Sequence, residues 1–78
     1  SIYPNPTNAD FTLQFSMLVE SEVVVTVIDL TGRSLLQTTL KQGESRRTCS
    51  LGTFPSGIYI VRASTNGKPI WTGKVVKE

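Results

Sequence analysis

Residues 23–33, VVVTVIDLTGR, combine a run of β-branched residues with a turn signal. Alternate positions of an extended strand face opposite sides, and every odd-numbered position from Val23 to Val27 is valine. Asp29 can accept hydrogen bonds from the backbone that follows it, and Gly32 can adopt a positive φ at little steric cost. This stretch therefore predicts a central strand within residues 23–30, with its odd-numbered valines in the core, followed by a bulged hairpin turn.

The same pattern continues on both sides of this stretch. Residues 11–16 alternate apolar and polar side chains, and no segment follows the 3.6-residue period of an amphipathic helix. Turn signals occur at residues 42–44, 55–57 and 66–67, and Asn66-Gly67 is typical of a two-residue hairpin. The remaining strands are predicted at residues 2–4, 34–41, 46–51, 58–64 and 69–77. The chain is therefore predicted to be all-β, a small seven-stranded antiparallel Ig-like β-sandwich that forms a single domain over residues 1–78.

Composition excludes several classes of function. The chain has 78 residues, no histidine and one cysteine, Cys49, so Ser-His-Asp and Cys-His catalytic sites and a zinc site are excluded. We therefore expect no enzymatic activity, no cofactor and no metal. The net charge of +2 is too small to indicate nucleic-acid binding, and no apolar run is long enough to span a membrane. The first residues do not resemble a signal peptide, so a secreted protein would need its export signal upstream of this chain.

Three spaced motifs and the last five residues carry a resemblance to a known family. Residues 2–8 read IYPNPTN, residues 29–33 read DLTGR, residues 51–62 read LGTFPSGIYIVR and residues 74–78 read KVVKE. In this order they resemble the motifs of the C-terminal sorting domain of the type IX (Por) secretion system. The resemblance covers nearly the whole chain, and motifs that are weak alone become specific when they occur together in order.

This resemblance implies a sorting signal for protein secretion in a Gram-negative bacterium. Such a domain directs a covalently linked upstream cargo protein, absent from this chain, across the outer membrane through a translocon. A cell-surface sortase then removes the domain, and the cargo is anchored on the cell surface or released. The protein would be transiently periplasmic and finally secreted or on the cell surface, and we expect the domain to be a monomer.

The resemblance also implies which residues have a role. Recognition by the translocon and sortase is predicted for the terminal residues Lys74, Val75, Val76 and Lys77 and for the opening residues Tyr3, Pro4, Asn5 and Pro6. Alternation places Lys74 and Val76 on one face of the last strand and Val75 and Lys77 on the other, and both lysines are expected to be displayed to solvent. Mainly structural roles are expected for the turn residues Gly32, Arg33, Pro55 and Gly57, and core positions for Tyr59 and Val61.

Local details lead to three further expectations. Cys49 alternates with Thr48 and Ser50 and is predicted to be a buried small hydrophobe without a redox role. Tyr59 is expected to anchor its hydroxyl on backbone near a corner of the sandwich. The family usually has a glycine after the asparagine of the opening motif, where this chain has Ala9, so we expect Asn8 to take the left-handed conformation there.

Other interpretations of the same residues stay open. Ile58 and Ile60, with Val24 and Ile28 beside them, can form an exposed apolar partner site or can be covered by a loop or by cargo. The module can be a carbohydrate-binding or adhesion sandwich that uses Trp71 and Tyr3 as stacking platforms. It can also be a spacer that stabilises a neighbouring catalytic domain. Arg46 and Arg47 are interpreted as a solvated edge rather than a phosphate-binding cluster.

Overall fold

The computed structural model describes residues 1–78 and contains seven strands and no helix. The strands are β1 (Ile2–Tyr3), β2 (Asp10–Gln14), β3 (Val23–Ile28), β4 (Ser34–Leu40), β5 (Arg46–Ser50), β6 (Gly57–Thr65) and β7 (Lys68–Lys77). The all-β class is confirmed, and the strand ends agree with the predicted ones to within two residues.

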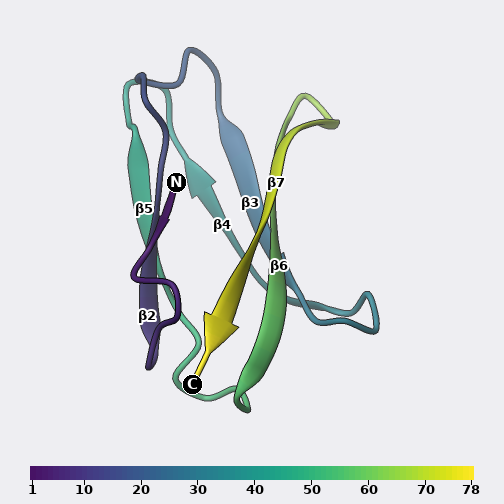
Figure 1. The fold of residues 1–78 in the computed structure, drawn as a ribbon. Coiled ribbons are helices and arrows are strands. Elements are labelled where there is room, and N and C mark those ends of the chain that lie inside the picture. The colour runs from purple at the N-terminus through teal and green to yellow at the C-terminus, as the bar shows by residue number, and fades with distance from the viewer.

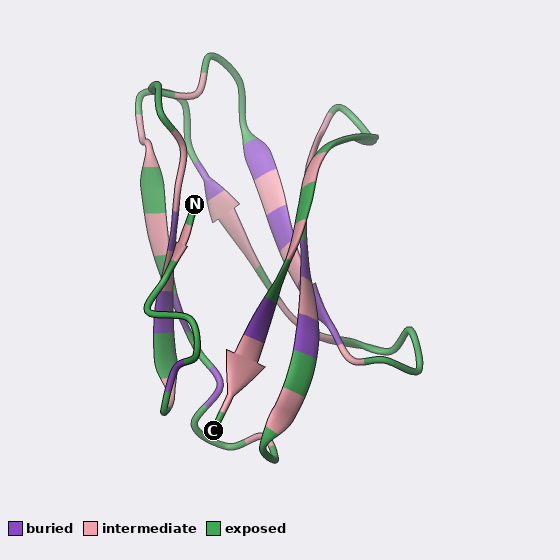
Figure 2. Ribbon diagram, viewed as in Figure 1, coloured by how far each residue is buried: buried purple, intermediate pink, exposed green.

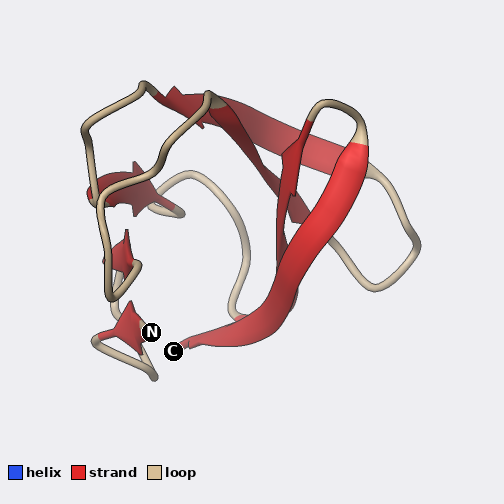
Figure 3. Cartoon of the chain, turned by 90° about the horizontal axis from the view of Figure 1, so that it is seen from above, coloured by secondary structure: helices blue, strands red, loops and turns tan.

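The strands form two antiparallel sheets that face each other (Figures 1 and 3). One sheet has the order β1-β2-β5 and the other β4-β3-β6-β7. When the strands are lettered A, B, C, C′, E, F and G in chain order, the sheets become A-B-E and C′-C-F-G. Strand C′ lies beside C in the G-F-C sheet, which is an immunoglobulin-like arrangement. The predicted small β-sandwich is confirmed.

The core lies between the two sheets, and buried residues alternate with more exposed ones along most of β2, β3 and β6 (Figure 2). The odd-numbered valines of β3 are buried as predicted, with Val25 and Val27 fully inaccessible to solvent. The other core residues are Phe11, Leu13, Leu40, Cys49, Leu51, Tyr59, Val61, Ala63 and Val75. Cys49 is therefore the predicted buried small hydrophobe, and burial raises the pKa of its thiol.

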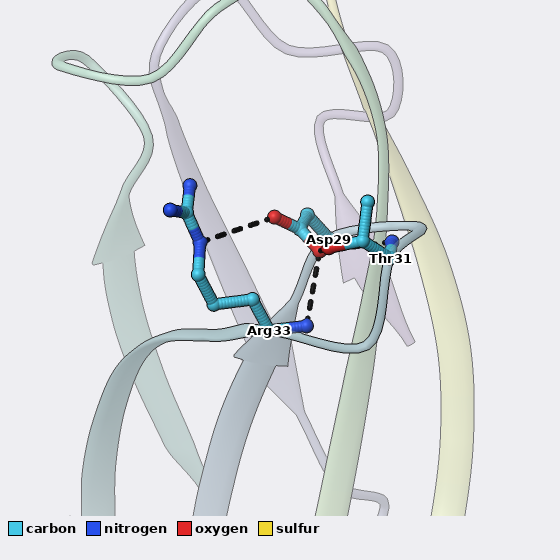
Figure 4. A network of polar contacts seen from close by, with 3 residues as sticks. All are labelled: Asp29, Thr31 and Arg33. Atoms are coloured by element: carbon cyan, nitrogen blue, oxygen red, sulfur yellow. Dashed lines mark hydrogen bonds and ion pairs between the residues drawn. The ribbon is translucent and has the colours of Figure 1, made fainter.

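Two hairpin turns have the chemistry that their residues predict. Asn66 (φ 52°) and Gly67 (φ 77°) are both left-handed, as a two-residue type I′ turn requires. In the β3–β4 turn, the Asp29 carboxylate accepts hydrogen bonds from the backbone N–H groups of Thr31 at 2.9 Å and Arg33 at 3.0 Å (Figure 4). Gly32, at φ 90°, supplies the left-handed residue of this turn.

The connection between β5 and β6 is fixed by a tyrosine. The Tyr59 side chain is 5% exposed, and its hydroxyl donates a hydrogen bond to the backbone carbonyl of Pro55. A tyrosine near the start of strand F that bonds backbone a few residues upstream is the tyrosine corner of immunoglobulin-like domains. The predicted anchoring of Tyr59 at a corner is confirmed.

The opening turn differs from the prediction. Asn66 is the only residue other than glycine with a positive φ, so the left-handed conformation expected at Asn8 is wrong. The turn is instead built on Thr7, whose Oγ1 accepts a hydrogen bond from Ala9 N at 3.2 Å and donates one to the carbonyl of Asp10. Because this geometry needs no positive φ, alanine fits at position 9 without strain.

Candidate recognition site at the C-terminal strand

The opening and terminal motifs, more than 60 residues apart in the sequence, lie side by side in the structure (Figures 1 and 3). Thr7 forms a parallel β-bridge with Lys77. Its backbone N–H donates to the carbonyl of Val76 at 2.8 Å, and its carbonyl accepts from the N–H of Glu78 at 2.9 Å. Two of the segments for which recognition was predicted are therefore joined along the outer edge of β7.

The Asn5 side chain extends this contact by acting in place of a peptide group. Its Nδ2 donates to the carbonyl of Lys74 at 2.9 Å, and its Oδ1 accepts from the N–H of Val76 at 2.9 Å. A side-chain amide has one acceptor and two donor hydrogens, so it can pair with a strand edge in this way. Asn5 thus holds the terminal motif from within the domain, although the residue itself is solvent-exposed.

Thr7 was not singled out from the sequence, yet it is the only buried polar residue, at 2% exposed. Its backbone and side-chain groups all have partners, in the terminal motif or in the opening turn. A buried polar residue with satisfied hydrogen bonds costs little, whereas an unpaired one is expensive. The only indication in the sequence is that this threonine directly follows Asn5-Pro6 of the opening motif. Its role depends on contacts with the distant terminal motif, which the sequence does not show.

The four residues of the predicted recognition tail have three different environments. Val75 is fully buried opposite Tyr59 and belongs to the core. Lys74 is exposed on the outward face of β7, and Val76 is half-buried on the same face. Only Lys74 and Val76 are therefore open to a partner that approaches this face.

The expectation that both lysines are displayed is wrong for Lys77. Its ammonium donates hydrogen bonds to the carbonyl of Phe54 and, at 3.4 Å, to that of Gly52. The β5–β6 connection passes close to the end of β7, since Gly57 is the strand partner of Lys77. Its carbonyls lack partners within a sheet, and a long cationic side chain can satisfy them.

The remaining opening residues are accessible to solvent. Pro4 and Pro6 are exposed, and the peptide bonds that precede them are cis. Tyr3 is 42% exposed on β1, and its hydroxyl donates to Oε1 of Gln14. Pro4 and Pro6 flank Asn5 in the connection between β1 and β2, and Tyr3 precedes them at the end of β1.

Tyr3 and Trp71 do not form a common stacking platform. Tyr3 belongs to the β1-β2-β5 sheet and Trp71 to β7 in the other sheet. The Trp71 indole packs against the core and lies over Gly73, where an added Cβ would be 2.3 Å from the indole Cη2. The structure thus gives Trp71 a packing role.

The motif turns gather at the end of the sandwich where β7 finishes. Pro55 and Gly57 lie in the connection that receives Lys77 and the Tyr59 hydroxyl. The turn with Gly32 and Arg33 lies at the same end, set to one side beyond β3 and β4 (Figure 1). Here the Thr31 hydroxyl, together with backbone N–H groups and Arg33, holds the pKa of Asp29 below its usual value.

Arg47 departs from the solvated edge that was expected. Its Nη2 donates to the carbonyl of Thr39 at 2.6 Å and to Oε1 of Glu44 at 2.8 Å. The bond to Thr39 connects β5 to β4, and the bond to Glu44 ties β5 to the connection between these strands, whereas Arg46 is exposed as expected. The Lys41 backbone N–H and Arg47 hold the pKa of Glu44 below its usual value.

Outside these contacts, the structure has one open groove and no candidate metal site. No three His, Cys, Asp or Glu side chains are placed to hold a metal ion, and no helix could cross a membrane. An open groove of about 280 Å³ lies at the opposite end of the sandwich. It is lined by Val19, Glu20, Ser21, Val23, Thr65 and Ile70.

The family model described as the secretion system C-terminal sorting domain matches residues 1–78, the full length of the chain. No curated protein matches it.

Proposed function

The chain belongs to the family of secretion system C-terminal sorting domains, and from this premise we propose that it directs a covalently attached upstream cargo protein across the outer membrane. The family is that of the type IX secretion system, and its domains are non-catalytic targeting modules. Proteins that carry them are secreted or exposed on the cell surface. Residues 1–78 act in this proposal as a single monomeric domain that needs no cofactor.

The observation that supports the proposal best is the contact between the opening and terminal motifs. Asn5 and Thr7 pair with the backbone of residues 74–78 and hold the terminal motif as an ordered strand. The first and last few residues of a domain are usually poorly ordered unless they are tied down. An ordered end that displays Lys74 gives a receptor a defined shape and charge to bind.

Within this proposal the predicted recognition residues divide into two groups. The translocon contacts the accessible side chains of Lys74 and Val76, and Tyr3, Pro4 and Pro6 form the adjoining surface. Asn5, Val75 and Lys77 act indirectly, because their contacts are with the domain itself. After passage through the periplasm and outer membrane, a cell-surface sortase removes the domain, and the cargo is anchored or released.

The proposal is tested by fusing residues 1–78 to the C-terminus of an inert periplasmic reporter. The fusion is expressed in two strains of one host, with and without the type IX machinery. We expect the reporter on the cell surface or in the medium only in the strain with the machinery. A reporter that stays in the periplasm of both strains would contradict the proposal and favour a spacer that only stabilises its neighbour.

A further inference from the structure

The outward face of the four-stranded sheet carries a small apolar cluster beside the terminal motif. Two cross-strand pairs form it, Ile58 with Val76 and Ile60 with Lys74. Ile28 on β3 is the partner of Ile60, but it is only 8% exposed and adds little accessible surface to the cluster. Ile58 is 42% exposed on this outward face, whereas Tyr59 and Val61, which alternate with Ile58 and Ile60 along β6, are buried between the sheets. We call the residues Ile58, Ile60, Lys74 and Val76 the tail face.

The outward strand positions around the tail face carry positive charge only, and the exposed Glu78 lies beyond them, two residues after Val76. Arg62 and Lys74 are the only charged residues among the outward positions of β3, β6 and the Thr72–Val76 part of β7. Neither has an ion-pair partner, since the ion pairs of the domain are Arg33–Asp29 and Arg47–Glu44. A partner that covers this face would gain from carboxylates placed opposite the two cations.

The backbone of the terminal strand is less accessible than its side chains. β6 pairs with one edge of β7, and Asn5 and Thr7 pair with the other edge from Lys74 to Glu78. A partner that added its own strand here would have to displace the opening segment and break four hydrogen bonds. The side chains of the tail face need no such displacement.

We propose that a protein component of the translocon docks on the tail face with an apolar surface that carries carboxylates. This inference rests on the proposed function and specifies its contact surface. The position of the tail face supports the inference, because two of its four residues, Lys74 and Val76, belong to the terminal motif. An anionic membrane is disfavoured as the partner, since two cations fall short of the clusters of roughly 4–8 that bind acidic lipids.

A matched pair of substitutions tests this surface. Val76→Thr changes the tail face, and Val24→Thr makes the same change at a half-buried outward position of β3, at the opposite end of the sheet. Each variant is fused to the periplasmic reporter, and its thermal unfolding is measured on the purified 78-residue chain. We expect Val76→Thr to lower surface delivery by about tenfold, as the loss of a central interface contact does, and Val24→Thr to leave delivery unchanged. If Val76→Thr prevents folding, Ile58→Thr replaces it, because Ile58 is more than a third exposed.

Three results would overturn the inference. The first is parental delivery by folded Val76→Thr and Ile58→Thr variants. The second is binding of the parental domain to phosphatidylglycerol vesicles that Val76→Thr abolishes, which would make the membrane the partner. The third is a parental fusion that is not delivered even with the machinery present, which would contradict the proposed function as well. Delivery of the parental fusion with loss only in the tail-face variants supports both.

Discussion

Lys74 and Lys77 belong to one motif, but their surroundings differ. Lys74 is exposed on the outward face, whereas the Lys77 ammonium is held by two carbonyls of the β5–β6 connection. Strand alternation correctly separates the two side chains onto opposite faces. Alternation cannot predict that the Lys77 side chain meets loop carbonyls on its face, because the path of residues 51–57 depends on the whole sandwich.

These surroundings predict different effects on stability. Lys77→Ala should lower the free energy of unfolding by about 1–3 kcal/mol, because carbonyls that accept from a cation lose their partner. Lys74→Ala should change it by only about 0.5 kcal/mol in either direction. Urea denaturation of the two variants measures both values. Equal values for the two lysines would contradict the contact seen at Lys77.

Gly73 is predicted to be required by its neighbour Trp71. A Cβ at position 73 would lie 2.3 Å from the indole, so Gly73→Ala should displace the ring and destabilise the domain by about 1–3 kcal/mol. Tryptophan fluorescence should shift toward the red as the indole becomes more exposed. Gly52→Ala is the matched control, because its added Cβ meets atoms no closer than 3.4 Å. A Gly73→Ala variant with parental fluorescence and stability would show that the indole does not occupy this position.

Asp29 is predicted to make stability depend on acid. The Thr31 hydroxyl, backbone N–H groups and Arg33 lower its pKa in the folded state. A carboxyl with a lowered folded pKa stabilises the fold above its unfolded pKa, about 3.9, and loses that effect as pH falls through the folded value. The temperature of unfolding should therefore decrease below about pH 4. Asp29→Asn should make this temperature depend less on pH in the same range. A smaller pH dependence should remain in the Asp29→Asn variant, because the pKa of Glu44 is also lowered in the folded state. An unchanged profile in Asp29→Asn would contradict the role of this carboxylate.

At the scale of elements, the strands follow from local chemistry, but their long-range contacts do not. Alternation predicts β2, β3 and β6, and Asn66-Gly67 predicts the β6–β7 hairpin, since a positive φ at both positions suits these residues. The bridge between Thr7 and Lys77 uses mostly backbone groups, which every residue has. No side-chain pattern could therefore predict it. The opening motif indicates a role for Asn5, but the sequence does not show that its side chain pairs with the backbone of β7.

The opening segment is predicted to stabilise the end of β7. Asn5→Ala removes both side-chain bonds to the β7 edge, so the Val76 amide hydrogen should exchange with solvent about tenfold faster. Hydrogen exchange followed by NMR on the 78-residue chain measures this rate. Asn8→Ala is the control in the same turn, because Asn8 is exposed, and it should leave the Val76 rate unchanged. Equal protection of Val76 in all three proteins would contradict the pairing by Asn5.

At the scale of the whole molecule, the family motifs meet at one end of the sandwich. The opening segment, the β5–β6 connection and the terminal strand are directly bonded to one another there. The opposite end holds an apolar groove that no motif lines. This arrangement explains why residues spaced along the whole chain can serve one function, since the fold assembles them around the ordered tail.

The most direct test of this account reverses the charge of Lys74 and measures folding and delivery on the same variant. Lys74 lies on the exposed face of β7, so Lys74→Glu should keep the free energy of unfolding within about 0.5 kcal/mol of the parental value. In a strain with the type IX machinery, its reporter should remain in the periplasm, while Lys74→Arg, which keeps the charge, should be delivered. Delivery of the Lys74→Glu reporter at the parental rate would contradict the claim that the displayed tail is the signal.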